Sequence, residues 1–249
     1  MFILKNDTIC KKIEFLSEGF ILRGILHLPS TEHPPVVIGS HGLLSSSESP
    51  KQIELARQCN AFGIAFFRFD HRGCGESQGD FAKVTSLGAR SKDLLSAVGL
   101  MRESADTANH IGLFGSSMGA AACLAIAREA RAKTVVTFAA PVRSRSVHGR
   151  IEKHYNINDT QGSLDTLNLD FDISDKLADI HNILIFHGDA DTVVPFSNAL
   201  EIYQKAARPK KLIRQPGGDH MMSQKAHQKH FITEAALWFK SSFGLESIQ

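Results

Sequence analysis

One serine in the sequence is flanked by glycines in a pattern that could make it a nucleophile. Gly115-Ser116-Ser117-Met118-Gly119 has the spacing G-x-S-x-G and stands between a short apolar run and an alanine-rich segment. A sharp turn from a strand into a helix strains its central residue and needs small flanking residues. Such a turn would lift the Ser117 hydroxyl to a sheet edge, beside helix N–H groups that favour negative charge. The alternative is a plain helix start between two glycines.

The partners that a nucleophilic serine needs occur later in the chain. A serine needs a base, and the base needs a group that orients it. The segment His187–Pro195 follows an apolar run and contains two acids, Asp189 and Asp191, while His220 follows the last such run. The chain order Ser117, Asp191, His220 is typical of hydrolases that carry their triad on a parallel sheet.

The elements that must position these residues follow from the hydrophobic pattern. Alternating apolar residues in the first thirty positions predict an antiparallel hairpin that closes at Pro29. Beyond it, short apolar runs without alternation indicate strands buried on both faces of a sheet. The runs cover residues 36–39, 64–67, 111–114, 135–138 and 183–186, with a short last strand around 212–214. Helical segments separate them, so we predict an α/β protein with a mostly parallel sheet and helices on both faces.

Helix signals lie between these runs. Ser49, Pro50 and Gln52 predict a helix that starts with a capping box, and Gly63 predicts its end. Further helices are expected over residues 87–101, 117–131 and 223–239.

One stretch, from Val142 to about Ile180, is polar, irregular and too long for an ordinary connection. It is either a disordered loop or an inserted cap whose small core would use Leu164, Leu167, Leu169 and Phe171. We expect one domain over residues 1–249 with a cap insertion at about 142–180. Tyr155 is the candidate for substrate contact, because an aromatic ring with a polar tip suits a half-wet pocket. The alternative is a ring packed under the cap.

Other residues near these motifs have a structural interpretation. The segment Gly73–Gly79 is similar to a dinucleotide-binding fingerprint, but its third glycine comes one position late, so we predict a turn. His41 and His187 are expected to brace loops rather than to act as the base. A zinc site is the alternative for His220, His227 and His230, but the chain has no HExxH motif.

Five blocks of sequence together resemble the α/β-hydrolase superfamily: Ser40–Leu43, Phe69–Ser77, Gly115–Gly119, His187–Pro195 and Gly218–His220. Within it, the chain is similar to small esterases and serine-aminopeptidase-like hydrolases, including bacterial cinnamoyl and feruloyl esterases. The resemblance implies the α/β-hydrolase fold over nearly the whole chain. It also implies Asp191 as the triad acid, with Asp189 as the competitor, and an oxyanion hole formed by the backbone N–H groups of Leu43 and Met118. A small cap that contacts the acyl group is implied as well.

The composition excludes several other classes. Lys+Arg 28 against Asp+Glu 26 leaves a net charge of +2, too balanced for an electrostatic nucleic-acid binder. The most apolar stretch, Ala120–Ala127, is far shorter than the ~20 residues of a membrane span. Four isolated cysteines fit a reducing compartment, and the first residues lack a signal-peptide core. We therefore expect a cytoplasmic protein; its oligomeric state is left open.

These observations predict a serine hydrolase that cleaves small-molecule carboxylic esters through an acyl-enzyme intermediate. Ser117 would attack, His220 would act as the base and Asp191 would orient it, without a metal or organic cofactor. Two alternatives remain at this point. One is the same chemistry on a thioester or on the N-terminal residue of a peptide. The other is a non-catalytic ligand-binding protein that keeps the fold.

Overall fold

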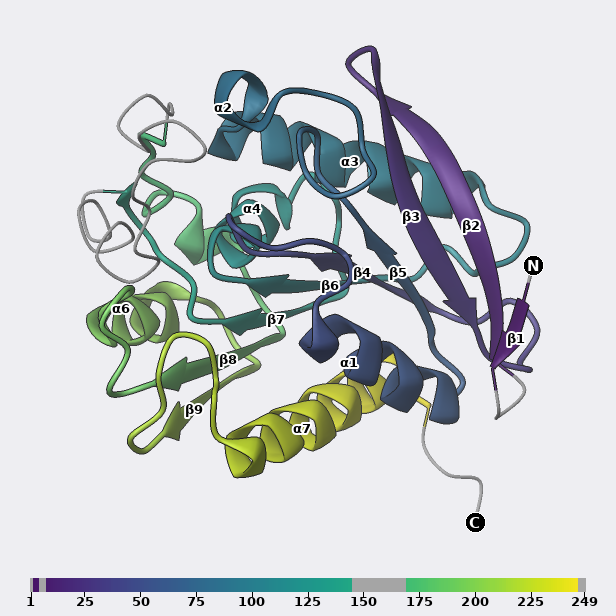
Figure 1. The fold of residues 1–249 in the computed structure, drawn as a ribbon. Coiled ribbons are helices and arrows are strands. Elements are labelled where there is room, and N and C mark those ends of the chain that lie inside the picture. The colour runs from purple at the N-terminus through teal and green to yellow at the C-terminus, as the bar shows by residue number, and fades with distance from the viewer. Residues whose placement is uncertain (1, 5–7, 145–168, 246–249) are drawn as a thin grey trace.

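A single twisted sheet runs through the molecule (Figure 1). The structure, a computed structural model, describes residues 2–4, 8–144 and 169–245. The strands in this part are β1 (Phe2–Leu4), β2 (Thr8–Ser17), β3 (Phe20–Leu28), β4 (Val36–Ser40), β5 (Ala65–Phe69), β6 (Ile111–Ser116), β7 (Thr134–Phe138), β8 (Ile183–Gly188) and β9 (Lys210–Gln215). Their order is β1-β2-β3-β5-β4-β6-β7-β8-β9. From β5 to β9 every neighbouring pair is parallel, which confirms the predicted fold class.

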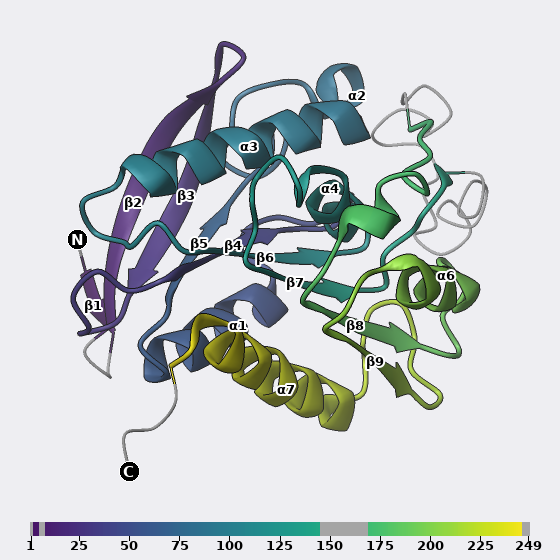
Figure 2. The same cartoon turned by 180° about the vertical axis from the view of Figure 1, so that it is seen from behind.

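Helices cover both faces of this sheet (Figures 1 and 2). They are α1 (Pro50–Ala61), α2 (Phe81–Val84), α3 (Leu87–Glu103), α4 (Met118–Ile126), the short 3₁₀ helix η3 (Leu177–Asp179), α6 (Ser197–Lys205) and α7 (Lys225–Phe243). The helices α1 and α7 lie together on one face, and α3, α4 and α6 lie on the other. Within the described ranges, no helix is both long enough and apolar enough to cross a bilayer.

The buried strands supply apolar residues to both layers. Val37 and Phe66 pack in the cluster that contains α1 and α7. Their chain neighbours, Ile38 and Phe67, pack in the cluster that contains α3, α4 and α6. This two-sided burial explains why the central strands read as unbroken apolar runs.

The N-terminal hairpin is present as predicted. The strands β2 and β3 pair antiparallel from Ile9–Leu28 to Ser17–Phe20. Glu18 and Gly19 form the tip with φ angles of 46° and 85°. Two positive φ angles in a two-residue loop match the right-handed twist of the flanking strands. β3 then pairs antiparallel with β5 and joins the hairpin to the parallel sheet.

The predicted capping box at the start of α1 is wrong. The helix begins at Pro50, but Ser49 makes no side-chain capping bond. The Gln52 side chain lies against β4 instead, since a Cβ added at Gly39 would stand 2.1 Å from its Oε1. Packing against the sheet has overridden the local capping preference.

Two helix ends also differ from the prediction. The helix α4 ends at Ile126 rather than near Arg131. Arg131 adopts a left-handed φ of 41°, and the Ala132 N–H bonds the Ala127 carbonyl at 3.0 Å, which turns the chain towards β7. The last helix runs past Phe239 and stops at Gly244, which has a left-handed φ of 73°.

The ends of the stretch from Val142 to Ile180 are anchored on the core. Arg143 and Asp172 form an isolated antiparallel bridge, and the Ile173 N–H bonds the Val142 carbonyl at 3.0 Å. Three apolar residues on the returning side are buried in the main core: Leu169, Ile173 and Leu177. Three predicted positions lie outside the described residues: Tyr155, Leu164 and Leu167.

The turn from β6 into α4 depends on two glycines. A Cβ at Gly115 would stand 2.4 Å from the Ala120 Cα. A Cβ at Gly119 would stand 2.2 Å from the Ser40 carbonyl oxygen and 2.5 Å from that of His41. Such separations are closer than any real Cβ contact. The first turn of α4 therefore packs backbone to backbone against the end of β4.

We expect Gly119→Ala to destabilise the fold by about 3 kcal/mol or more, because the new methyl group overlaps fixed backbone atoms. For a chain of this size the melting temperature should fall by on the order of 10 °C. The matched control is Gly99→Ala in α3, where a Cβ would meet nothing within 4 Å and alanine favours the helix. Thermal unfolding followed by circular dichroism measures both variants. Equal melting temperatures would show that the close contact at Gly119 does not exist.

Candidate active site

Ser117 occupies a strained turn at the carboxyl end of β6. Its φ and ψ are 53° and −123°, outside the regions that suit a residue with a side chain. The Ser117 N–H bonds the Phe138 carbonyl at 2.8 Å, so the neighbouring strand β7 holds the turn. This is the geometry of a nucleophile elbow.

His220 connects Ser117 to a carboxylate. Its Nε2 lies 3.1 Å from Ser117 Oγ, and its Nδ1 lies 2.8 Å from Asp191 Oδ2. A proton on Nδ1 would be donated to the carboxylate, which leaves Nε2 to accept from the serine hydroxyl. The structure thus brings together the three residues that the sequence singled out, although they lie on three separate loops.

The Asp191 carboxylate is held in its charged form. Burial by itself raises the pKa of Asp191, but hydrogen bonds with His187, His220 and the backbone outweigh it and place this pKa below its ordinary range. Oδ1 accepts the N–H groups of Val193 and Val194, both at 2.8 Å. His187 stands 3.4 Å from Oδ2 and also contacts the Val194 carbonyl at 2.8 Å. His187 therefore lies behind the acid and not beside the serine.

The competing acid, Asp189, points elsewhere. Its carboxylate accepts Arg214 Nε at 2.7 Å and the Gly217 N–H at 2.6 Å. These hydrogen bonds connect the loop after β8 both to strand β9 and to the loop after β9. Of the two acids, Asp191 is the one in contact with His220.

The loops that carry Asp191 and His220 meet at a second close backbone contact. A Cβ at Gly188 would stand 2.1 Å from the Gly218 carbonyl oxygen. The Ala190 N–H bonds that same oxygen at 3.1 Å. Lys51 at the start of α1 adds a further tie, since its Nζ donates to the Met221 carbonyl at 3.0 Å. His220 is thus fixed from the side of β8 and from the side of α1.

The predicted oxyanion groups adjoin the serine. Met118 is the first residue of α4, where backbone N–H groups have no acceptor within the helix. Gly42, immediately before Leu43, would place a Cβ 3.6 Å from Ser117 Cβ. Two segments with backbone N–H groups therefore lie beside the hydroxyl, one from α4 and one from the loop after β4.

Arg90 of α3 holds that loop, and it was not singled out from the sequence. Its guanidinium donates to the carbonyls of His41 at 3.0 Å, Gly42 at 3.4 Å and Leu43 at 3.1 Å. The side chain is completely buried, and a cation there must be satisfied by hydrogen bonds. One signal was available: Arg90 lies three residues after Leu87 and four before Leu94, so the three side chains share one face of the expected helix.

Two further buried histidines brace the same region in neutral form. His41 Nδ1 lies 2.8 Å from the Gly42 carbonyl, and its Nε2 accepts the His71 N–H at 3.2 Å. Burial, with Arg90 and His71 nearby, lowers the pKa of His41 well below its ordinary value. Burial also lowers the pKa of His71 to about 4, and Ser40 Oγ stands 2.8 Å from its Nε2. Both ring nitrogens of His41 are engaged, so it is not placed to act as a base.

The loop after β5 is a turn, as predicted for Gly73–Gly79, and it is fixed by a buried ion pair. Asp93 of α3 accepts Arg72 Nε at 2.9 Å and Nη2 at 2.7 Å. It also accepts the Arg72 backbone N–H at 3.0 Å. Burial alone raises the pKa of Asp93, but hydrogen bonds with His71 and Arg72 bring it down to about 2. Asp93 is therefore charged at neutral pH and anchors this loop to α3.

The same arrangement of strands occurs in known esterases. Est1E from Butyrivibrio proteoclasticus, with ferulic acid bound, superposes with a TM-score of 0.79 at 21% identity, covering 93% of this chain and 99% of that one. The Pyrococcus furiosus esterase Pf2001 superposes with a TM-score of 0.78 at 18% identity, covering 94% and 91%. These likenesses establish that the chain has the α/β-hydrolase fold.

The family follows from the sequence match. The family model "serine aminopeptidase, S33" matches residues 31–157, half of the chain, and the protein belongs to this family. The chain is 29% identical over 167 residues to the protein YfhR of Escherichia coli O157:H7, covering 62% of this chain and 52% of YfhR. It is 27% identical over 221 residues to mouse palmitoyl-protein thioesterase ABHD10, mitochondrial, covering 77% of this chain and 71% of ABHD10. The chain thus spans about half the length of YfhR. It belongs to a family of hydrolases and has the α/β-hydrolase fold.

We expect Asp93 to make the fold sensitive to acid. Because its pKa is lowered on folding, from 3.8 to about 2, the stability it contributes is present above pH ~4 and is lost as the pH falls towards 2. The shift corresponds to about 2 kcal/mol. Asp93→Asn should therefore unfold more easily in urea at pH 7, and its deficit relative to wild type should shrink between pH 4 and pH 2. A deficit that stays constant over this range would exclude the buried carboxylate as its cause.

Proposed function

We propose that the protein hydrolyses carboxylic esters through an acyl-enzyme intermediate. The observation that carries this proposal is the continuous line of contacts from Ser117 Oγ to His220 Nε2 at 3.1 Å and from His220 Nδ1 to Asp191 Oδ2 at 2.8 Å. The structural likeness to the Pyrococcus furiosus esterase Pf2001 supports the same reaction class.

In the proposed mechanism, Ser117 Oγ attacks the acyl carbon while His220 Nε2 takes the hydroxyl proton. The backbone N–H groups of Leu43 and Met118 stabilise the oxyanion that forms. His220 then gives the proton to the departing alcohol, and the acyl group stays on Ser117. A water molecule, activated by His220, releases the acid and restores the serine. Asp191 keeps the imidazole in the required tautomer, and these steps call for no metal or organic cofactor.

Arg90 is the positioning residue for the oxyanion side. A carbonyl and the N–H of the following residue belong to the same planar peptide group. The hydrogen bond from Arg90 to the Gly42 carbonyl therefore also orients the Leu43 N–H. Preorganised donors of this kind need no rearrangement when the charge develops. The buried guanidinium also adds positive charge close to that point.

A thioester is the second candidate substrate, because the similarity to ABHD10 covers 77% of the chain. An aminoacyl bond is the third, in line with the family description. All three substrates use the same acyl-enzyme chemistry, whereas a ligand-binding protein without activity would turn over none of them.

The proposal also covers the domain organisation and the cellular location of the protein. We place a single domain over residues 1–249, with a cap insertion at about 142–180 of which the described residues are 142–144 and 169–180. Its anchored ends follow β7, at the edge of the sheet that carries Ser117, where ligands bind in open α/β sheets. We also place the protein in the cytoplasm, since its four cysteines are buried and unpaired.

Ser117→Ala should remain folded but lose on the order of 10⁴-fold to 10⁶-fold in kcat, because the hydroxyl is the nucleophile. A panel of p-nitrophenyl esters, thioesters and aminoacyl anilides should show the highest kcat/KM on the esters for wild type. A fluorophosphonate probe should label wild type and leave the variant unlabelled. Retention of a tenth of wild-type activity by Ser117→Ala would refute the assignment, and preference for another panel member would replace the ester by that substrate.

The two acids should differ in their effect on activity. Asp191→Asn should lower kcat by about 10⁴-fold, because an imidazole in the wrong tautomer cannot accept the serine proton. The control, Asp189→Asn, changes an acid on the same loop that contacts Arg214 and should lose much less. Steady-state kinetics on one ester compares them. Equal losses would leave His220 without an assigned orienting acid.

A further inference from the structure

We infer that a cavity beside the oxyanion loop is the acyl subsite of the enzyme, shaped for an uncharged apolar acyl group larger than acetyl. The inference rests on the proposed ester hydrolysis and names the part of the substrate that determines specificity. The cavity has a volume of about 470 Å³, within the usual range for ligand pockets.

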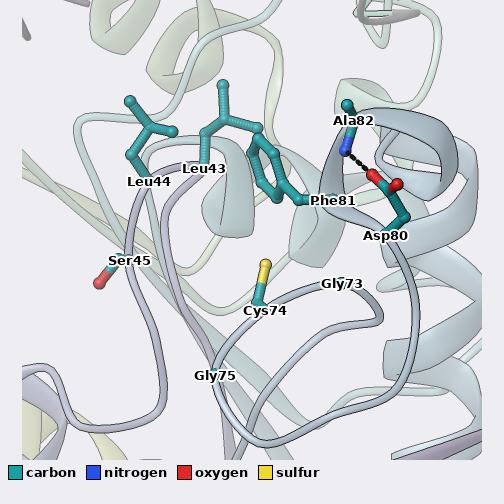
Figure 3. A pocket seen from close by; sticks show the side chains of 9 residues that line it. All are labelled: Leu43, Leu44, Ser45, Gly73, Cys74, Gly75, Asp80, Phe81 and Ala82. Atoms are coloured by element: carbon teal, nitrogen blue, oxygen red, sulfur yellow. Dashed lines mark hydrogen bonds between the residues drawn. The ribbon is translucent and has the colours of Figure 1, made fainter. Parts of the chain in front are cut away.

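Three segments from two neighbouring loops line the cavity: residues 43–45 after β4, and residues 73–75 and 80–82 after β5. Figure 3 shows the side chains of Leu43 and Phe81 next to each other, with the Cys74 sulfur pointing towards them. The Ser45 hydroxyl points away from this group. Apolar side chains and a thiol therefore form one side of the cavity, and Ser45, Asp80 and the backbone of the loop after β5 add polar groups to the rest.

The cavity lies one residue beyond a segment that adjoins the nucleophile. Gly42 would place a Cβ 3.6 Å from Ser117 Cβ, and Leu43, the next residue, lines the cavity. Successive Cα atoms are ~3.8 Å apart. An acyl group bonded to the reacting carbon must therefore extend about the length of one residue before it enters the cavity. Arg90 joins the two loops underneath, since its Nη2 lies 3.1 Å from the Leu43 carbonyl and 3.5 Å from Cys74 Sγ.

The topology of the sheet decides which half of the ester enters the cavity. The strand β6, which carries Ser117, lies between β4 and β5 on one side and β7, β8 and β9 on the other. His220 follows β9, so the alcohol that it protonates must leave towards that side. The oxyanion faces the Leu43 and Met118 N–H groups. The remaining substituent of the tetrahedral carbon, the acyl group, is directed away from His220, towards the loops after β4 and β5.

The chemistry of the walls defines the acyl group. Leu43, Leu44, Phe81 and Ala82 offer apolar surface, which favours hydrocarbon by burial. The one ionic wall residue, Asp80, accepts the Ala82 N–H at 3.1 Å at the start of α2 and pairs with Lys83 Nζ at 3.2 Å. No Lys or Arg is among the described residues that line the cavity, so it offers no cation to an acyl group that is itself an anion. A straight alkyl or an arylalkyl acyl group satisfies these conditions.

Two opposite changes of cavity size test the inference. Ala82→Trp should fill the cavity, and Phe81→Ala should enlarge it. Ala105→Trp is the matched control, because it makes the same substitution at an exposed alanine that does not line the cavity. One substrate series varies the acyl group of p-nitrophenyl esters from acetyl to octanoyl and phenylpropanoyl. The other series keeps the acetyl group and varies the alcohol.

Ala82→Trp should lower the octanoyl-to-acetyl ratio of kcat/KM at least about tenfold, while Phe81→Ala should raise it and Ala105→Trp should leave it unchanged. An effect confined to the alcohol series would make the cavity an alcohol subsite and overturn the inference. Identical ratios for Ala82→Trp and Ala105→Trp in an active enzyme would overturn it too, and would leave the proposed function intact. If wild type hydrolyses no ester and takes up no fluorophosphonate, both proposals fail together.

A chemical measurement on wild type gives a result that does not depend on how the variants fold. Cys74 is 6% exposed, whereas the other cysteines are fully buried, so a small methanethiosulfonate should modify Cys74 first. Ser117 can be phosphonylated beforehand, with loss of fluoride, by reagents that carry either a methyl or an octyl group on phosphorus. The octyl group should occupy the cavity and slow the modification of Cys74. Equal rates after methyl and octyl phosphonylation would contradict the inference.

Discussion

The candidate site depends on a steric constraint, the contact of backbone with backbone at Gly119. The first turn of α4 lies so close to the end of β4 that a Cβ at Gly119 would stand 2.2 Å from the Ser40 carbonyl oxygen. This contact brings the loop after β4, with Gly42 and Leu43, beside the hydroxyl of Ser117. It also helps to hold Ser117 at a positive φ that an isolated serine would avoid. Any side chain at this point would separate the nucleophile from the groups expected to stabilise its oxyanion.

A second contact of the same kind lies on the other side of the serine. Gly188 and Gly218 allow the loops after β8 and β9 to touch, which puts His220 within hydrogen-bond distance of Asp191. Parallel strands end at one edge of a sheet, so residues far apart in sequence are delivered to the same place. The two glycine contacts then bring these loops close enough for direct contact between the three side chains.

Buried charges hold the loops between these contacts. Asp191 is negative and receives two backbone N–H groups, while Arg90 is positive and donates to carbonyls of residues 41–43. Arg90 of α3 donates mainly to backbone carbonyls and so orders the loop after β4. Asp191 accepts from two backbone N–H groups and also contacts His220 and His187, which orders its own loop. A buried charge left unsatisfied would be very costly, so these loops have few alternative conformations. Preorganisation of this kind is what electrostatic catalysis requires.

The sequence by itself determined the strands, the fold class and the order of the three candidate catalytic residues, because these depend on local periodicity and short spacings. The runs at 36–39 and 111–114 predict buried strands whatever surrounds them. The resemblance in the sequence favoured Asp191 over Asp189, but only the tertiary structure shows that Asp191 contacts His220 while Asp189 contacts Arg214. It also turned Gln52 away from its helix cap and placed the Arg90 guanidinium under the oxyanion loop. Those outcomes depend on contacts between segments distant in the chain, whose free energies exceed the local preferences of a cap or a helix face.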